Sequence, residues 1–188
     1  MAAAGKKARQ EGWTIIFVDE AGFYLLPGVV KTYAPRGQTP QLRVPLTRDH
    51  LSAIGALSWT GEVVIRLQEG SVNGGDIVAF LRQLLHHFSG KLLVLWDGLP
   101  AHRSQTVKDF LRDEAAGRLH LERFPVYAPD LNPVEGLWRH LKHVELRNVC
   151  CLHLPHLRYL LSRAVRRLQL KTTVLLGCIR LAGLSPAL

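Results

Sequence analysis

The sequence predicts an α/β fold, in which a mixed β-sheet is flanked by helices and followed by basic helices at the C-terminus. Two segments, Thr14–Val18 and Leu92–Trp96, are short and almost continuously apolar, a pattern typical of strands buried on both faces. Apolar side chains recur every three or four residues over 77–88 and 157–168, which indicates amphipathic helices. Such strands and helices bury their apolar faces against one another, so a single layered domain is expected.

The N-terminal half of the chain also predicts an antiparallel portion of the sheet. His50–Trp59 and Glu62–Leu67 flank a Thr60-Gly61 turn, and two apolar runs around such a turn favour a β-hairpin. Lys31–Ala34 is a candidate for a further strand. A hairpin beside strands that are linked through helices makes the expected sheet mixed.

The middle of the chain predicts helices and strands in alternation. The helix over 77–88 has Asn73 as a candidate N-cap, and a second helix is expected over 104–116. Gly117 is placed to end that helix, and 119–124 resumes as a strand. The crossover from strand to helix to strand should be right-handed.

The composition is that of an ordinary globular protein. Of the 188 residues, 47% are hydrophobic and 21% are charged, which excludes a disordered or fibrous chain. No run approaches the roughly 18 apolar residues that a membrane span needs, and the first residues lack the apolar core of a signal peptide. Three cysteines cannot form a disulfide framework and suit a reducing compartment, so a cytoplasmic location without membrane contact is expected.

Positive charge is concentrated at the C-terminus. Of the formal net charge of +9, the segment up to Glu135 carries +1 and residues 136–188 carry +8. A segregated basic surface attracts polyanions, because neutralised phosphates release condensed counterions, so nucleic acid is the first partner to consider. A solvated basic face would have the same composition, and this alternative stays open.

The C-terminal helices are expected at about Pro133–Arg147 and Pro155–Leu170. On the second of them, basic side chains occupy the surface that the apolar stripe leaves, so one side packs and the other is positively charged. The residues expected to face DNA are Arg139, Lys142, Arg158, Arg163, Arg166, Arg167 and Lys171. The chain is therefore divided into a flexible extension at 1–12, a main domain at 13–148 and a basic helical extension at 149–188 packed on that domain.

Two aspartates stand at the ends of the two most apolar strands. Asp19 follows Thr14–Val18 and Asp97 follows Leu92–Trp96. In an open α/β sheet, reactive groups gather outside the carboxyl ends of the strands, so two neighbouring strands would place both carboxylates in one crevice. Divalent cations such as Mg²⁺ prefer oxygen ligands of this kind. Aspartate also ends strands simply as a turn residue, and for either aspartate alone that is the commoner explanation.

Glu135 is the candidate for a third carboxylate. Asn132, the proline after it and Glu135 also form the pattern of a helix start, with Asn as the N-cap and Glu at the third position. Metal binding and helix capping are both compatible with this position. Glu20, Asp130 and Asp76 are weaker candidates, because Glu20 points to the opposite side of an extended chain from Asp19 and the other two have turn-like contexts.

Four blocks of sequence together resemble a known family. They are Phe17-Val-Asp-Glu-Ala-Gly-Phe23, Ala34-Pro-Arg-Gly-Gln-Thr-Pro40, Leu95-Trp-Asp-Gly-Leu-Pro-Ala-His-Arg-Ser104 and Tyr127-Ala-Pro-Asp-Leu-Asn-Pro-Val-Glu-Gly-Leu-Trp138. In this order they resemble the DDE endonuclease domain of mariner-type bacterial insertion-sequence transposases. The resemblance runs from about Trp13 to the C-terminus.

The resemblance implies a ribonuclease H-like fold and a catalytic triad of Asp19, Asp97 and Glu135 that holds two Mg²⁺ or Mn²⁺ ions. It implies DNA phosphodiester hydrolysis and strand transfer, the reactions of DNA transposition and integration, without a protein nucleophile. His102 matches a histidine frequent at that place in the family and is a possible auxiliary residue, although a helix-start histidine is equally compatible. Gly98 departs from the family, where many relatives carry Asn.

The resemblance also implies partners and a cellular context. The expected substrates are transposon ends and target DNA, and the expected active complex is a homodimer. Relatives usually carry N-terminal helix-turn-helix modules, whereas this chain begins almost at the first strand, so it resembles the catalytic half of a split transposase or a truncated relic. A bacterial cytoplasmic protein associated with the nucleoid is expected. The alternative is a catalytically inert DNA-binding or assembly module derived from a transposase.

Overall fold

The computed structural model describes residues 11–26, 28–43, 47–97, 104–115, 117–125 and 129–185 of the chain. Its elements in chain order are β1 (Trp13–Tyr24), β2 (His50–Ser58), β3 (Val63–Glu69), α2 (Gly74–His87), β4 (Lys91–Trp96), α3 (Gln105–Asp113), β5 (Leu119–Arg123), the 3₁₀ turn η2 (Pro129–Leu131), α4 (Pro133–His140), the π-helical turn η3 (Leu141–Glu145), α5 (Leu154–Gln169) and α6 (Thr172–Leu181). Most of the extension expected at 1–12 lies outside the described residues. None of the described helices is long and apolar enough to cross a membrane.

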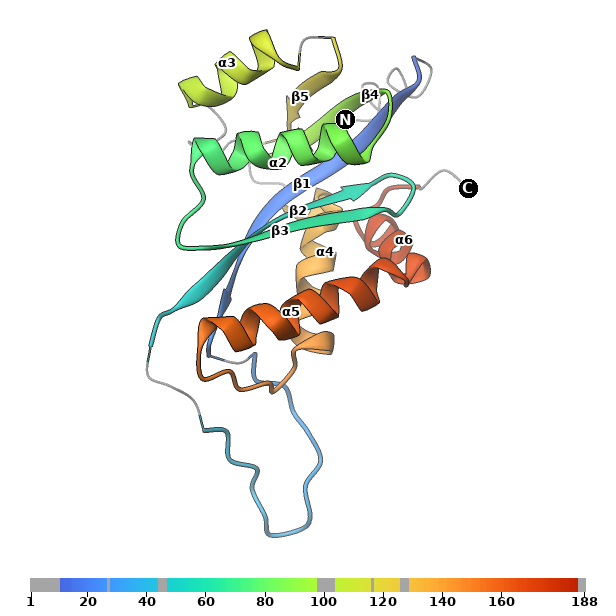
Figure 1. Cartoon of the computed structure of the whole chain (residues 1–188). Coiled ribbons are helices and arrows are strands. Elements are labelled where there is room, and N and C mark those ends of the chain that lie inside the picture. The colour runs from blue at the N-terminus through green and yellow to red at the C-terminus, as the bar shows by residue number, and fades with distance from the viewer. Residues whose placement is uncertain are drawn as a thin grey trace.

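The five strands form one mixed sheet in the order β3-β2-β1-β4-β5 (Figure 1). β2 pairs antiparallel with both β1 and β3, while β4 is parallel to both β1 and β5. The hairpin predicted around Thr60-Gly61 is confirmed, because 51–57 pair with 63–69. Gly61 has a φ of 85°, a conformation that glycine adopts in tight turns without steric cost. The predicted mixed sheet is therefore confirmed.

The long connection between β1 and β2 extends away from the sheet, and its described residues contain no strand (Figure 1). The strand predicted at Lys31–Ala34 is therefore wrong. A run of residues with strand propensity forms a strand only when a neighbouring backbone pairs with it, and residues 28–43 have no such pairing. The base of the connection is held by Asn148, whose side-chain amide donates to the Val30 carbonyl at 3.0 Å and accepts from the Val30 N–H at 2.8 Å.

Side chains of β1 alternate between two apolar cores, one on each side of the sheet. Ile16 and Val18 pack with α2 and α3, whereas Ile15 and Phe17 pack with α4, α5 and α6. All four side chains are buried. Because helices close both faces, the start of β1 is almost continuously apolar instead of alternating between apolar and polar residues.

The helix predicted over Pro133–Arg147 is interrupted. α4 gives way after eight residues to the π-helical turn η3, in which the Leu146 N–H donates to the Leu141 carbonyl. Helix α6, which the sequence pattern did not place, packs closely on α4 at Gly136. A Cβ atom at Gly136 would come within 3.2 Å of Cys178, so the glycine allows this close approach.

Candidate active site

Asp19 lies inside strand β1, so the expectation that it follows the end of the strand is wrong. β1 continues to Tyr24, and Asp19 pairs with Gly55 of β2 in the antiparallel register. The strand continues because backbone pairing does not depend on the polarity of the Asp19 and Glu20 side chains. Since side chains alternate along a strand, Asp19 projects on the same face as Phe17, toward α4.

Asp97 directly follows β4, the parallel neighbour of β1, as the sequence indicates. The register sets Phe17 opposite Leu95. Continuing it by two residues brings Asp97 beside Asp19. Asp97 is half-buried. Two adjacent strands therefore supply two carboxylates at one place in the sheet.

The segment that follows Asp97 includes two residues of interest from the sequence. His102, the possible auxiliary residue, and Gly98, the departure from the family, both lie in 98–103, outside the described residues. The role of His102 stays a prediction.

Glu135 lies in the first turn of α4, and Asn132 ties that end of the helix to β1. The Asn132 side chain accepts from the Val134 N–H at 3.2 Å and donates to the carbonyl of Val18 at 3.3 Å. Val18 is the residue before Asp19. The Glu135 side chain is exposed and forms no hydrogen bond or ion pair with the described residues. Capping is therefore performed by Asn132, and the Glu135 carboxylate is available for a ligand.

The three carboxylates influence one another. Burial and then the charge of Glu135 are the two largest effects that raise the pKa of Asp19, and the charge of Asp97 adds to them. A hydrogen bond from Trp138 acts in the opposite direction, and the resulting pKa of Asp19 is about 7. A bound cation would relieve this repulsion. Carboxylate oxygens are the donors that hard divalent cations prefer, so the residues present fit such an ion.

The carboxylates do not form a closed cage. In the described part of the chain, no three acidic, histidine or cysteine side chains are gathered as a ready-made metal-binding cluster. Asp19 lies on β1 and Glu135 on a helix that packs across the sheet, while Asp97 directly follows β4, so each donor lies on a regular element of the fold or next to one. Sites built on such elements hold their ligands in a fixed arrangement.

Trp138 is a site residue that the sequence analysis did not identify. Its indole Nε1–H donates to Oδ2 of Asp19 at 2.8 Å, and the side chain is buried. In the sequence, the tryptophan resembles a core aromatic residue. The available signal was its position three residues after Glu135, because residues spaced by three share one face of a helix.

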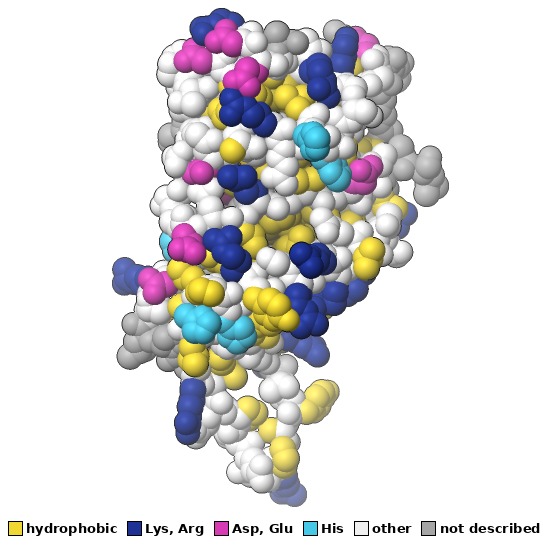
Figure 2. Space-filling view, viewed as in Figure 1, with side chains coloured by type: hydrophobic (Ala, Val, Ile, Leu, Met, Phe, Trp, Pro, Cys, Tyr) yellow, Lys and Arg dark blue, Asp and Glu magenta, His cyan; other side chains and the backbone are white. Residues whose placement is uncertain are grey.

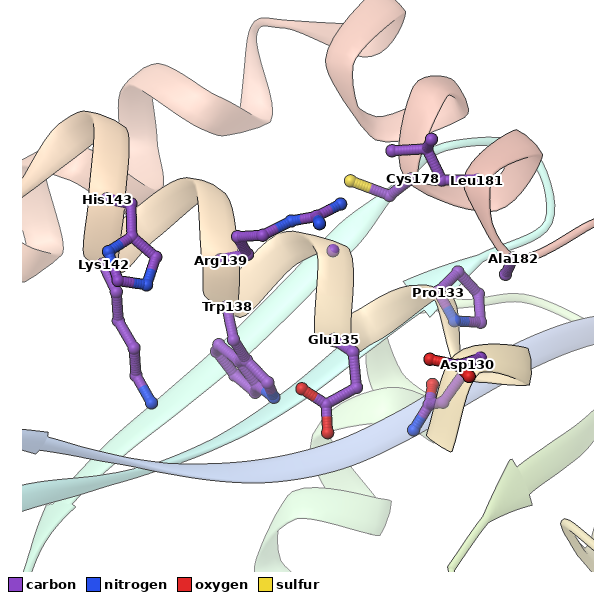
Figure 3. Close-up of a pocket in the computed structure, with 12 residues that line it drawn as sticks. Asp130, Pro133, Glu135, Trp138, Arg139, Lys142, His143, Cys178, Leu181 and Ala182 are labelled. Carbon is purple, nitrogen blue, oxygen red and sulfur yellow. The ribbon is translucent and has the colours of Figure 1, made fainter. Parts of the chain in front are cut away.

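A groove of about 730 Å³ opens beside Glu135, with walls from α4, η3 and α6. Two residues predicted to face DNA, Arg139 and Lys142, line it. Figure 3 shows Glu135 and Trp138 of α4 and Lys142 of η3 projecting to the same side. Asp130, which the sequence analysis treated as a turn residue, also lines the groove. Acidic and basic side chains therefore share one groove, an arrangement that can hold both a cation and a phosphate.

The other residues predicted to face DNA lie on α5 or directly after it, and most have partners within the protein. Arg167 donates to the Glu145 carboxylate at 2.6 and 2.9 Å, and Lys171 donates to it at 2.8 Å. Burial opposes the ionisation of Glu145, but these hydrogen bonds outweigh it and lower the pKa of the carboxyl group. Arg158 donates to the Leu67 carbonyl at 3.1 Å.

Two arginines of α5 have no acidic partner in the described part of the chain. The Arg163 guanidinium lies over the Tyr159 ring at 5.6 Å and donates to its hydroxyl group. Arg166 forms no hydrogen bond or ion pair with the described residues and is exposed. Figure 2 shows Lys and Arg side chains gathered along the surface around α5. Whether this surface contacts DNA stays a prediction.

Comparison with known sequences gives two matches. A family model described as DDE superfamily endonuclease matches residues 14–149. The 39 kDa protein of insertion element IS630 from Shigella sonnei is 26% identical over 140 residues, which make up 73% of this chain and 40% of that protein. The chain therefore spans less than half the length of this relative.

Comparison with solved structures supports the fold. The pre-cleavage Mos1 transpososome matches with a TM-score of 0.64 and 17% identity, over 97% of this chain and 60% of the Mos1 chain. The catalytic domain of Mos1 mariner transposase alone matches with a TM-score of 0.57 and 15% identity, over 97% of this chain and 89% of that domain. The ribonuclease H-like fold expected from the sequence is confirmed.

Proposed function

The chain belongs to the DDE superfamily of endonucleases, and from this premise we propose that it is the catalytic domain of a transposase. It hydrolyses DNA phosphodiester bonds at transposon ends and transfers the freed 3′ end to target DNA. The observation that supports the proposal most is that Asp19 and Asp97 stand on the neighbouring parallel strands β1 and β4, Asp97 directly after its strand, while α4 carries Glu135 and is joined to Asp19 by the Trp138 N–H. Carboxylates that repel one another at the edge of a groove are typical of a site that binds a cation.

Membership of this family implies a divalent metal, and we assign two Mg²⁺ or Mn²⁺ ions to these three carboxylates. When bound, such ions activate the attacking oxygen and stabilise the leaving oxygen in an in-line displacement at phosphorus. Solved Mos1 mariner paired-end complexes with Mn and with Mg support this choice. The protein itself holds the donors: β1 carries Asp19, the end of β4 carries Asp97 and α4 carries Glu135.

The substrate is DNA, and its phosphates meet the basic wall of the groove. Arg139 and Lys142 line the groove beside Glu135, so a backbone that enters it passes two cations next to this carboxylate. The Mos1 structures include a transpososome and a paired-end complex, which supports transposon ends as the substrate. We assign a homodimer as the active complex. We assign end recognition to a separate helix-turn-helix portion and the location to the bacterial nucleoid.

A nicking assay tests the proposal. The purified protein should convert supercoiled plasmid to the open circular form in Mg²⁺ or Mn²⁺ and not in EDTA. Asp97→Ala should abolish the reaction, since it removes one of three ligands. Glu20→Gln is the matched control, because Glu20 neighbours Asp19 but lies on the opposite face of β1, and it should keep the activity.

Two outcomes separate the transposase from the alternative function. DNA binding that weakens with salt, without metal-dependent cleavage by the unaltered protein, would show an inert DNA-binding or assembly module. Cleavage that survives Asp97→Ala would show that a contaminating nuclease or another site performs the reaction.

A further inference from the structure

The indole of Trp138 is held between a carboxylate and a glycine of the neighbouring strand. Its Nε1–H donates to Oδ2 of Asp19 at 2.8 Å. Asp19 pairs with Gly55 across β1 and β2, and a Cβ atom at Gly55 would come within 2.7 Å of Cζ2 of the indole and closer still to Cη2. Real Cβ contacts are not this short, so the indole occupies its position only because residue 55 has no side chain.

Further contacts fix the plane of the same ring. Phe23 meets the indole edge-on, with ring centroids 5.9 Å apart and an interplanar angle of 75°. The side chain of Trp138 is only 3% exposed. Asn132 fastens the start of α4 to the Val18 carbonyl, so the helix is tied to β1 on both sides of Glu135. The indole therefore has little freedom to leave Asp19.

Filling the space between Asp19 and Gly55 does not by itself require an indole. Phenylalanine would fill much of the same space without an N–H group, whereas tryptophan supplies one directed donor to a buried carboxylate. A carboxylate has about four lone-pair sites, and the Trp138 N–H and the Glu20 backbone use only some of those on Asp19, so others remain for a metal. Trp138 and Glu135 lie three residues apart on one face of α4, so a single helix places both the third carboxylate and the group that orients the first.

We propose that Trp138 is a positioning residue for the metal site, that it orients the Asp19 carboxylate through its N–H group, and that Gly55 provides the space for it. The proposal rests on the proposed function, since it assigns these two residues to the metal site of the same enzyme. Residues that orient metal ligands in this way typically contribute 10- to 100-fold to metal affinity.

Binding of Mn²⁺, measured by electron paramagnetic resonance of the free ion, tests the N–H group directly. Trp138→Phe should weaken Mn²⁺ binding by about tenfold, the lower end of the range for residues that orient metal ligands. Trp13→Phe is the matched control. Trp13 lies at the start of β1, the strand that carries Asp19, but its side chain contacts Lys91 and His120 instead of Asp19. Equal Mn²⁺ affinity in the Trp138→Phe variant and the unaltered protein would overturn the proposal.

The glycine is tested by a double-mutant cycle on the same Mn²⁺ affinity. Gly55→Ala should also weaken binding by about tenfold, because the added methyl group displaces the indole. In the Trp138→Phe background the same substitution should have a much smaller effect, since the end of the indole is gone. Gly177→Ala, at a site where a Cβ meets nothing within 4 Å, is the control. Fully additive effects of the two substitutions would contradict the assigned role of Gly55.

A measurement on the unaltered protein keeps the proposal testable if a variant fails to fold. With ¹⁵N-labelled tryptophan, the indole N–H signal of Trp138 should be protected from solvent exchange and should shift on Mg²⁺ addition more than the signals of the other tryptophans. An unshifted Trp138 signal in protein that binds Mg²⁺ would overturn the positioning role. Absence of any Mn²⁺ or Mg²⁺ binding by the unaltered protein would instead refute the proposed function.

Discussion

The two faces of the sheet are closed by helices in different ways. On the α2/α3 face, the core is built from apolar side chains such as Ile16, Val18 and Phe80, and no ionisable group is buried in it among the described residues. On the α4–α6 face, the same strand places Asp19 next to a buried core, under the indole of Trp138. The α2/α3 face is packed with apolar side chains. The α4–α6 face also buries the Asp19 carboxylate, which lowers the stability of the fold when that group is charged.

The difference separates the source of stability from the site of chemistry. Apolar packing on the α2/α3 face stabilises the fold without regard to pH or metal. The α4–α6 face bears the repulsion among Asp19, Asp97 and Glu135, which a cation would relieve. Substitutions on the two faces should therefore differ in magnitude and in their dependence on pH and Mg²⁺.

The largest effect is expected from the α2/α3 face. Phe80→Ala should lower the free energy of unfolding by about 3–5 kcal/mol, because it removes an almost fully buried side chain and leaves a cavity in its place. The gain in stability on Mg²⁺ addition should be unchanged, since Phe80 lies across the sheet from the carboxylates. Urea denaturation with and without Mg²⁺ measures both quantities. Loss of the Mg²⁺ effect in this variant would show that the two faces are coupled.

A smaller and pH-dependent effect is expected at Asp19. Its folded-state pKa of about 7 lies above the ordinary value of 3.8, so the folded protein keeps a proton that the unfolded chain has released. The contribution of Asp19 to stability is therefore full below about pH 4 and is lost as the pH rises toward 7. Each unit of pKa difference corresponds to about 1.4 kcal/mol.

Asp19→Asn tests this dependence in metal-free protein. At pH 8 the variant should be more stable than the unaltered protein by up to about 4 kcal/mol, since the pKa rises by roughly three units, and the difference should shrink toward pH 4. Saturating Mg²⁺ should reverse the order, because only the aspartate binds the ion strongly. Denaturation curves in EDTA at several pH values measure the effect. A difference that does not vary with pH would mean that Asp19 titrates normally.

The sequence predicted the architecture better than the contacts of the site. The two buried strands, the hairpin and the main helices are local patterns, and the structure contains them. The first strand was predicted to end at Val18, before Asp19, whereas it continues to Tyr24, because pairing with β2 and not hydrophobicity continues a strand. Helix α6 has no strong polar face, so its apolar pattern did not distinguish it from the core around it.

The side-chain pairings were beyond the reach of sequence patterns. The contact between Trp138 and Asp19 joins residues 119 positions apart, and the space for it comes from Gly55 on a third segment. Likewise, the sequence predicted that Arg167 and Lys171 are available to DNA, whereas in the structure both donate to the Glu145 carboxylate. Such pairings depend on the register of strands and on how helices cross the sheet.

A smaller effect is expected at Glu145, and it tests how much of the basic charge on the α4–α6 face is available to DNA. Its carboxylate has only 7% exposure and accepts hydrogen bonds from Arg167 and Lys171. Glu145→Gln should lower the free energy of unfolding by about 1.5–3 kcal/mol, the range for a hydrogen bond to a charged group. The same change should strengthen DNA binding, since it releases two cations. Glu69→Gln, at an exposed partner of Arg158, is the control, with little effect on stability.

Thermal denaturation and fluorescence anisotropy on one duplex measure the two effects of Glu145→Gln. A variant that is less stable but binds DNA no more tightly would show that Arg167 and Lys171 face away from the DNA path.

The smallest effects are expected in the salt dependence of DNA binding. They distinguish the two basic regions of this face, the groove beside Glu135 and the surface of α5. Each phosphate contact that is lost should reduce the slope of log K against log salt by about 0.9. Arg139→Ala with Lys142→Ala should therefore reduce it by about 1.8 and also slow cleavage, because both residues line the groove beside Glu135. Asp97→Ala should keep or strengthen binding while cleavage disappears, since it removes a negative charge from the DNA path.

The matched comparison is the triple variant Arg163→Ala, Arg166→Ala and Arg167→Ala on α5. Because Arg167 is already paired with Glu145, the slope should fall by about 1.8, as for two contacts instead of three, and the cleavage rate at saturating DNA should be retained. Anisotropy titrations over a range of salt concentrations give both slopes. An unchanged slope in the triple variant would mean that α5 faces solvent or protein, and DNA would then follow the groove and the basic residues of the connection between β1 and β2.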